Sequence, residues 1–326
     1  MATEQYPVHF KAACVIEDDY VFIAAKPDDL DEEQAFTRIF FYDAQQRQMP
    51  WRHMDWIDSA VVDVCVSRVS FGGQRRYVAL SKQGQVHYSW PQGFETEQIP
   101  DAGIDRDTPI YGYLNAIREI SGRLYACGGG GQIYVRGNAG WSNLAGALRV
   151  AVTAPKPNLA LNQIQMGDEL GDIDGFSEND LYVVGHGTVR QYDGVQWTAC
   201  EVPTDEILLA VLCTAEGEVW ACGFNGTILR GNASSGFKDV SRFDDNMIFS
   251  SMCIYGKLLY LASNEGLFAL DMTDRDPRIT KIPEITDTDF VGCTGATIWS
   301  VGNKDIVYSD GSTWTRIDHP DNPPIR

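Results

Sequence analysis

The histidines are the first side chains to test for chemistry, because imidazole serves both as a metal ligand and as a general base. The chain has five, namely His9, His53, His87, His186 and His319. No two of them lie within four residues of each other, so neither an HxH nor an HExxH pair exists. A metal site would need histidines from separate parts of the fold. We therefore predict no metal site, and we interpret His186 as a turn residue.

Two segments match ligand-binding motifs only in part. Residues 127–132, CGGGGQ, are rich in glycine, but no GK[ST] follows and the next expected element is a strand. A phosphate cradle needs a helix N-terminus, so we interpret this run as a hairpin turn. Residues 172–175, DIDG, are a fragment of a calcium loop. We expect no cofactor.

Four arginines raise the question of a sialidase-like site, which needs an arginine triad, a tyrosine nucleophile and nearby acids. They are Arg118, Arg149, Arg190 and Arg230. Arg190 and Arg230 end the related phrases GTVR and GTILR, so a repeat accounts for their positions. The GxSxG turn of serine hydrolases is also missing from the sequence. We predict no catalytic residue and a chain that is not an enzyme.

The eight cysteines follow the repeat rather than a disulfide or metal pattern. Cys213, Cys253 and Cys293 recur at intervals of 40 residues, and no CxxC pair exists. Cys127 and Cys222 occupy the same short phrase, YACG and WACG. We interpret the cysteines as small apolar residues at equivalent buried positions, with no disulfide framework.

The charge balance restricts the partners of this chain. It has 45 acidic and 26 basic residues and a formal net charge of −19, which repels nucleic acid and anionic membranes and attracts basic proteins. The alternative is that the acids only maintain solubility. The N-terminal residues lack a secretory signal pattern, and no window of 18 residues is free of charged and turn residues. We expect a bacterial cytoplasmic protein that binds neither nucleic acid nor membranes.

A repeated phrase organises the second half of the chain. Residues 180–197 read DLYVVGHGTVRQYDGVQW, 218–230 read EVWACGFNGTILR, and 297–314 read TIWSVGNKDIVYSDGSTW. Residues 123–141 have the same layout, and residues 258–269 match it more weakly. Each phrase is an apolar strand, a tight turn and a second, alternating strand, often followed by a turn and a Trp. This pattern is typical of a β-hairpin.

An aromatic residue marks the first strand of each hairpin, and a further strand is expected before and after each hairpin. The markers are Phe22, Tyr77, Tyr125, Tyr182, Trp220, Tyr260 and Trp299. We therefore predict an all-β fold, a single β-propeller domain over residues 1–326 with seven four-stranded blades; six and eight blades are the alternatives. The expected blades span residues 11–56, 60–100, 113–147, 170–202, 207–242, 247–283 and 288–318, with an insertion at 148–169.

The phrases VVGHGTV…DGVQW and ACGFNGTILR resemble the repeats of bacterial BNR-like propellers, a group that includes photosystem II assembly factors. The resemblance covers blades three to seven better than blades one and two. The Asp-box of that group is present only in shortened form, as residues 309–314, SDGSTW. The resemblance implies the propeller architecture and no catalytic residue.

The acidic residues gather in the expected loops. In a propeller, the loops between blades share a face with the turns between the second and third strands of each blade. We therefore predict one acidic rim that binds a partner, to which the insertion at 148–169 contributes apolar residues. The predicted partner-binding residues are Asp28, Asp29, Asp31, Glu32, Glu33, Asp58, Asp168, Glu169, Asp205, Glu206, Asp244, Asp245 and Asp287.

The favoured function is a non-catalytic binding protein, a monomer on its own, whose acidic face captures a basic protein partner. One form of this hypothesis is an immunity protein that inhibits a secreted bacterial toxin. The alternatives are a hydrolase or lyase with a site in the central channel, and a protein-assembly factor.

Overall fold

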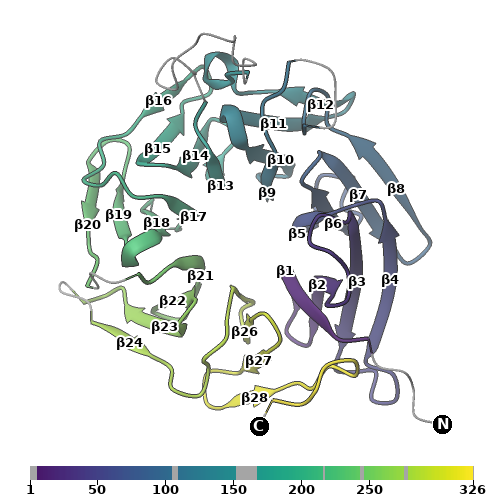
Figure 1. The fold of residues 1–326 in the computed structure, drawn as a ribbon. Coiled ribbons are helices and arrows are strands. Elements are labelled where there is room, and N and C mark those ends of the chain that lie inside the picture. Colours follow the sequence, from purple (N-terminus) through teal and green to yellow (C-terminus); the bar gives the residue numbers. More distant parts are fainter. Residues whose placement is uncertain are drawn as a thin grey trace. The chain divides into compact units, whose positions relative to one another are not determined.

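The structure is a computed structural model that describes residues 6–104, 109–151, 167–215, 217–242, 246–274 and 278–325. Asp244, Asp245 and most of the expected insertion lie outside the described residues. The described chain forms 28 strands in seven four-stranded antiparallel sheets (Figure 1). In each sheet the four strands are consecutive along the chain. The predicted fold, a β-propeller with seven blades, is confirmed.

The first three sheets cover the N-terminal half of the chain. The strands of the first sheet are β1 (Val8–Glu17), β2 (Tyr20–Pro27), β3 (Phe36–Asp43) and β4 (Trp51–Ile57). Those of the second are β5 (Val61–Ser67), β6 (Arg76–Ser81), β7 (Gln85–Trp90) and β8 (Gly93–Gln98). Those of the third are β9 (Leu114–Ile120), β10 (Arg123–Gly128), β11 (Gln132–Gly137) and β12 (Gly140–Asn143).

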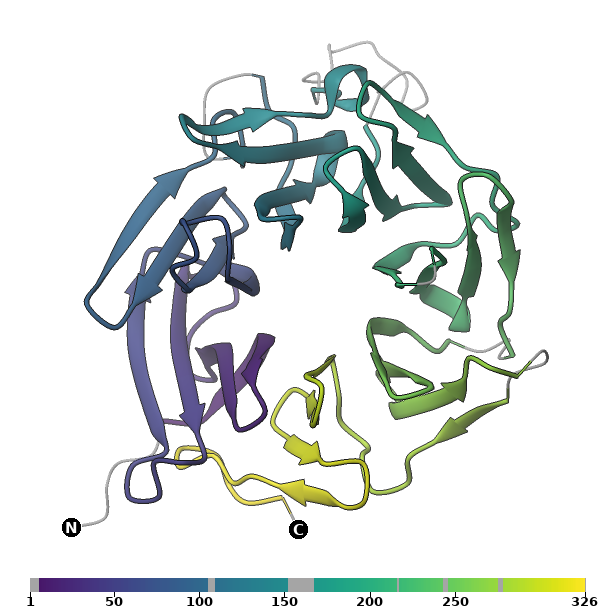
Figure 2. The ribbon, with the colours of Figure 1, turned by 180° about the vertical axis from the view of Figure 1, so that it is seen from behind.

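Four sheets follow, seen from the other side in Figure 2. The fourth has β13 (Leu170–Ser177), β14 (Asp180–Gly185), β15 (Thr188–Tyr192) and β16 (Trp197–Ala199). The fifth has β17 (Leu208–Cys213), β18 (Val219–Gly223), β19 (Ile228–Asn232) and β20 (Gly236–Asp239). The sixth has β21 (Phe249–Tyr255), β22 (Leu258–Ser263), β23 (Gly266–Asp271) and β24 (Ile279–Lys281). The seventh has β25 (Phe290–Cys293), β26 (Ile298–Val301), β27 (Ile306–Ser309) and β28 (Trp314–Arg316).

Helical structure in the described residues is confined to single turns of 3₁₀ type. They are η1 (Gly129–Gly131), η2 (Gly146–Leu148) and η4 (Phe224–Gly226). The turn η1 joins β10 to β11, so the glycine run is part of a hairpin connection, as predicted. In η4, Asn225 and Gly226 have positive φ angles of 51° and 68°, which suit their Asn-Gly sequence. No helix in the described part of the chain has the length and apolar character needed to cross a bilayer.

Burial falls from the second strand of a sheet to the fourth. All five residues of β18 and all four of β26 are buried, whereas the last two residues of both β16 and β28 are exposed. A strand that is covered on both faces needs a continuous apolar run, and an edge strand tolerates polar residues. This explains why the seven aromatic markers all lie in second strands.

The chain divides into two compact units, each described by itself below. The first unit is Met1–Val64, Cys222–Thr227 and Val240–Arg326, and the second is Cys65–Ala221 and Ile228–Asp239. In the first unit, Val8, Phe10 and Ile23 pack with Trp299 and Val301 in one core, so the first sheet contacts the last. In the second unit, residues of the third and fourth sheets share another core. The eight cysteines are free thiols, as predicted. The prediction that they occupy buried positions holds for four of them and is wrong for the other four, which are half-buried: Cys14, Cys200, Cys213 and Cys293.

Candidate functional site

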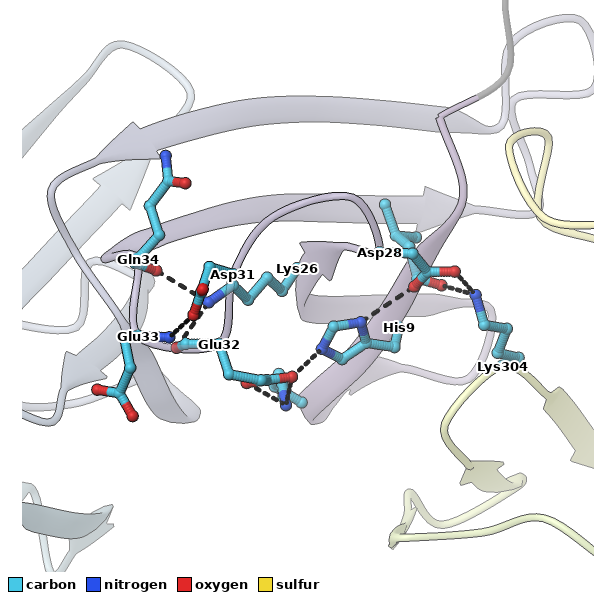
Figure 3. Close-up of polar contacts among 10 residues, drawn as sticks. His9, Lys26, Asp28, Asp31, Glu32, Glu33, Gln34 and Lys304 are labelled. Atoms are coloured by element: carbon cyan, nitrogen blue, oxygen red, sulfur yellow. Dashed lines mark hydrogen bonds and ion pairs between the residues drawn. The ribbon is translucent and has the colours of Figure 1, made fainter.

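The acidic turn, residues 28–33, connects β2 to β3 in the first unit (Figure 3). Its five carboxylate residues are exposed. The buried Lys26 stabilises the turn, because its Nζ donates hydrogen bonds to the backbone oxygens of Glu32 and Gln34, both at 2.9 Å. The ammonium group therefore fixes the path of the backbone while the carboxylates remain in solvent.

The carboxylate of Asp28 joins the first sheet to the seventh. It pairs with His9 Nδ1 at 3.1 Å and with Lys304 Nζ, and the lysine lies in the turn between β26 and β27. Partial burial raises the pKa of Asp28, but the hydrogen bonds from Lys304 and His9 outweigh burial and hold this pKa below its usual value. The residue stays ionised and acts as a fixed anion.

Glu32 forms a second ionic contact in the same place. Both of its carboxylate oxygens lie 3.4 Å from Lys11 Nζ, and one lies 3.3 Å from His9 Nε2. The charge of Lys11 lowers the pKa of Glu32. The side chain of Glu33, by contrast, points away from His9 and Lys26 in Figure 3.

A cavity of about 600 Å³ lies beside these ion pairs, within the first unit. Its lining residues come from the first, sixth and seventh sheets and their loops: His9, Phe10, Lys11, Asp28, Glu32, Asn264, Asp287, Asp289, Asn303 and Lys304. Four carboxylates therefore face two lysines. The cavity has a volume within the range of small-molecule sites and an excess of negative charge.

Asp287 and Asp289 differ in how their charge is compensated. The carboxylate of Asp287 accepts hydrogen bonds from the backbone N–H groups of Asn303 and Lys304, both at 2.9 Å. Among the described residues, none donates a hydrogen bond to the carboxylate of Asp289. Burial and the charge of Asp287 raise the pKa of Asp289. The negative charge of the cavity is therefore least compensated at Asp289.

Several predicted partner-binding acids of the second unit have partners within the protein. Asp168 pairs with Arg190 at 2.8 Å, and Glu169 accepts a hydrogen bond from Asn115 Nδ2 at 2.8 Å. The backbone oxygen of Glu206 accepts from the N–H of Gly187 at 2.8 Å. Only the ion pair with Arg190 compensates a carboxylate charge, so Asp168 contributes less negative charge to these loops than its sequence position indicates.

The loops and turns named in the prediction do adjoin one another. Gly187, in the turn between β14 and β15, contacts the loop that carries Asp205 and Glu206. Gly131 N–H donates to the backbone oxygen of Asp168 at 2.7 Å. Asp58 is exposed and has a positive φ of 61° in the connection between the first and second sheets. A single acidic rim formed by all these segments stays a prediction.

The structure brings Asp28, Glu32 and Asp287 together at the cavity, and sequence reasoning missed the residues that complete it. These are His9, Lys11 and Lys304. Lys304 and Asp28 are 276 positions apart, and His9 and Asp28 are 19 apart. No local sequence pattern signals a contact between different strands and sheets.

The DIDG fragment has a structural role. Asp172 pairs with Arg118 at 2.9 Å, and Asp174 accepts a hydrogen bond from the N–H of Cys213 at 2.7 Å. Burial raises the pKa of Asp174. No cluster of His, Cys, Asp and Glu suited to a metal ion occurs in the described ranges.

Comparison with known proteins gives one relative of similar length. No family model matches the chain. Over 319 residues the chain is 28% identical to Immune protein Tsi7 of Pseudomonas aeruginosa, an alignment that covers 92% of this chain and 94% of that protein.

Solved structures show the fold alone. Virginiamycin B lyase from Staphylococcus aureus matches with a TM-score of 0.66 and 13% identity, covering 92% of this chain and 94% of that one. The WD40 β-propeller domain of Doa1 matches with a TM-score of 0.62 and 11% identity, covering 94% and 93%. The resemblance noted in the sequence therefore holds at the level of the propeller, and the narrower likeness to photosystem II assembly factors is not confirmed.

Proposed function

We propose that this chain is an immunity protein that binds a toxin protein and blocks it without catalysing a reaction. The observation that carries the proposal is the 28% identity to an immune protein along nearly the whole length of both chains. The alignment covers 92% of this chain and 94% of the relative, so the match is not confined to a few sheets. The fold is compatible with this role, since a propeller presents many loops on a rigid framework.

The partner is a basic protein. The net charge of −19 produces a negative field that accelerates the approach of a positively charged partner. The acidic turn offers exposed carboxylates, and the adjacent cavity can take the end of a lysine or arginine side chain beside Asp289. Asp58, Asp205 and the other predicted loop acids extend the surface, with those already paired contributing less.

The test has two steps, capture of partner proteins by the immobilised chain and rescue of a host cell from their toxicity. The immobilised chain is exposed at low salt to secreted proteins of the organism that encodes it, and proteins released by salt are identified. Each basic candidate is then expressed in a heterologous host with and without this chain. The expected result is a candidate that stops growth alone and is tolerated with the chain. Continued toxicity of every captured protein would reject the proposal.

The contribution of the acidic turn is measured with matched triple variants. Asp29→Asn, Asp31→Asn and Glu33→Gln remove three charges from the turn. Glu17→Gln, Glu95→Gln and Glu178→Gln remove three exposed charges elsewhere. We expect the first set to slow association with the identified toxin roughly tenfold and to weaken its salt dependence. Equal rates for the two sets would remove the acidic turn from the interface while leaving the immunity function intact.

The sequence also allowed a hydrolase or lyase. The likeness to virginiamycin B lyase is one of fold at 13% identity, so it carries no activity to this chain. If rescue requires one copy of the chain bound to each toxin molecule, the result supports inhibition by binding. Rescue by trace amounts of the chain, accompanied by covalent change of the toxin, would instead support an enzyme.

A further inference from the structure

The segment after the last strand, residues 317–322, runs back onto the first sheet, and we name it the C-terminal segment (Figures 1 and 2). Its far end is tied to β1, because Val8 N–H donates to the Oδ1 atom of buried Asn322 at 2.8 Å. Each sheet has its own four consecutive strands, so no strand exchange joins the first sheet to the last. The contacts of this segment help to hold the two sheets together.

His319 is the buried centre of the C-terminal segment. His319 is 4% exposed. Its ring makes T-shaped contacts with three aromatic rings. The ring centroids lie 4.4 Å from Phe40, 4.7 Å from Trp51 and 5.5 Å from Phe10. These residues belong to three different strands of the first sheet. The imidazole ring therefore fills a pocket formed by aromatic side chains of the first sheet.

The hydrogen bonds of His319 define its protonation state. Its Nδ1 atom accepts a hydrogen bond from the N–H of Asp321 at 3.2 Å, so the ring proton is on Nε2. Nε2 is buried and has no hydrogen-bond partner in the described part of the protein. A second proton can bind only at Nδ1, where it would displace the N–H of Asp321.

The surroundings oppose that second proton. Arg38 on β3, His53 on β4 and Lys304 in the turn between β26 and β27 all disfavour a positive charge on this ring. Within and just before the segment, the charged side chains are Arg316, Asp318 and Asp321. Burial, followed by those three basic groups, lowers the pKa of His319 to about 4 from its ordinary 6.5.

We propose that the C-terminal segment is an acid-sensitive latch between the first and last sheets. A proton from solvent binds Nδ1 of His319, the hydrogen bond from Asp321 is lost, and the charged ring leaves the aromatic pocket. Asn322, which is bonded to the same turn through its N–H and the backbone oxygen of His319 at 3.2 Å, then releases Val8. Acid therefore opens the joint that neutral pH keeps closed.

Opening of the latch also changes one edge of the cavity beside the acidic turn. Lys304 Nζ donates to the backbone oxygen of Val8 at 3.2 Å and pairs with Asp28, so the end of β1 and the acidic turn share one anchor. His9, the next residue on β1, bonds Asp28 as well. The latch thus controls the geometry of this edge of the cavity, whether or not the chain is an immunity protein.

Hydrogen exchange followed by mass spectrometry tests the latch in the intact chain. Peptides containing Val8 and residues 317–325 are compared at pH 7.5 and pH 5, after correction for the intrinsic exchange rate at each pH. Linkage between the ordinary pKa of 6.5 and a folded pKa of about 4 gives an opening constant on the order of thirtyfold higher at pH 5. An unchanged constant in the wild-type protein would overturn the proposal.

Three variants separate the latch from general acid sensitivity. His319→Phe keeps a ring in the pocket but cannot bind a proton, so its opening should not depend on pH. Asn322→Ala removes the acceptor for Val8 and should expose that amide at both pH values. His87→Phe is the matched control, because His87 is a half-buried histidine of the second unit whose pKa is also lowered to about 4 by loss of solvation. Persistence of the thirtyfold rise in His319→Phe would overturn the proposal.

Discussion

Two ionic clusters of this protein both pair carboxylates with basic side chains, but they differ in how much negative charge remains without a partner. In the second unit, Arg136 on β11 makes a two-pronged contact with Glu97 on β8, at 2.8 and 2.6 Å. Its guanidinium also stacks over Phe71 at 4.6 Å. Tyr88 OH donates to Glu97 at 2.8 Å and accepts from Trp141 Nε1 at 3.1 Å. Both carboxylate oxygens of Glu97 and the hydroxyl of Tyr88 are hydrogen-bonded within this cluster, which is typical of a structural joint.

The cluster around Asp28 in the first unit is open in comparison. His9, Lys11 and Lys304 compensate Asp28 and Glu32, and backbone N–H groups compensate Asp287. Among the described residues no group donates a hydrogen bond to the carboxylate of Asp289, the charge of Lys11 offsets its raised pKa only in part, and the cluster borders a cavity. The difference indicates that a saturated cluster joins sheets, whereas a cluster with surplus charge beside a cavity can also receive a ligand.

The largest expected effect concerns the saturated cluster. Arg136→Ala leaves the Glu97 carboxylate without its cationic partner, and the side chains of Arg136 and Glu97 are only 18% and 21% exposed. We expect the free energy of unfolding to fall by about 3 kcal/mol or more, measured by urea denaturation. The control is Arg123→Ala, which breaks a pair with Glu178 that is about half exposed on both sides and should cost less than about 1 kcal/mol. Equal losses would mean that the second unit does not depend on this joint.

Lys304→Ala should have an intermediate effect. The lysine side chain is 30% exposed and supports both Asp28 and Val8, so we expect a loss of about 1 kcal/mol in the free energy of unfolding. The pKa of Asp28 should rise, because a hydrogen bond that lowers it is removed. That lowered pKa stabilises the folded state fully above the ordinary value of 3.8, and the stabilisation is lost as the pH falls through the lower pKa of the folded state, so the difference between variant and wild type should shrink in acid. A difference that grows as the pH falls would contradict the role given to this ion pair.

The smallest expected effect on the free energy of unfolding comes from Asp289→Asn, and this variant distinguishes the two clusters most clearly. The pKa of Asp289 is raised, so its ionised form destabilises the folded state at neutral pH. Asp289→Asn should therefore increase the free energy of unfolding, by less than about 1 kcal/mol because the group is partly solvated. If the cavity receives a basic side chain, the same variant should bind the toxin more weakly. A variant that is less stable yet binds normally would show that Asp289 is structural, like Glu97.

Much of the fold could be predicted from local pattern. The phrase around VWACGFNGTILR contains an apolar strand, a turn with Asn225 and Gly226, and a second strand, and the structure has these elements in that order. The aromatic markers identified the second strand of every sheet, including the divergent first and second sheets. The acidic turn was also visible as a run of acids between two strands.

The candidate site was visible only in part. Asp28, Glu32 and Asp287 were predicted as partner-binding residues from their charge and their expected loop positions, and the structure places them at one cavity. Asp168 was predicted in the same way, yet it pairs with Arg190, which the repeat seemed to explain as a surface residue. A carboxylate in a loop has the same sequence signature whether or not a cation from another strand neutralises it.

The sequence by itself determined the hairpin modules and the acidic character of their connections, because turns and alternating strands depend on residues within about 40 positions of each other; it favoured seven blades and left six or eight open. Tertiary structure alone decided which acids keep their charge in solvent and which histidine is buried. Lys304 reaches Asp28 and Asn322 reaches Val8 across 276 and 314 positions. Such contacts form where separate sheets pack, and packing between sheets leaves no periodic trace in the residues that make it.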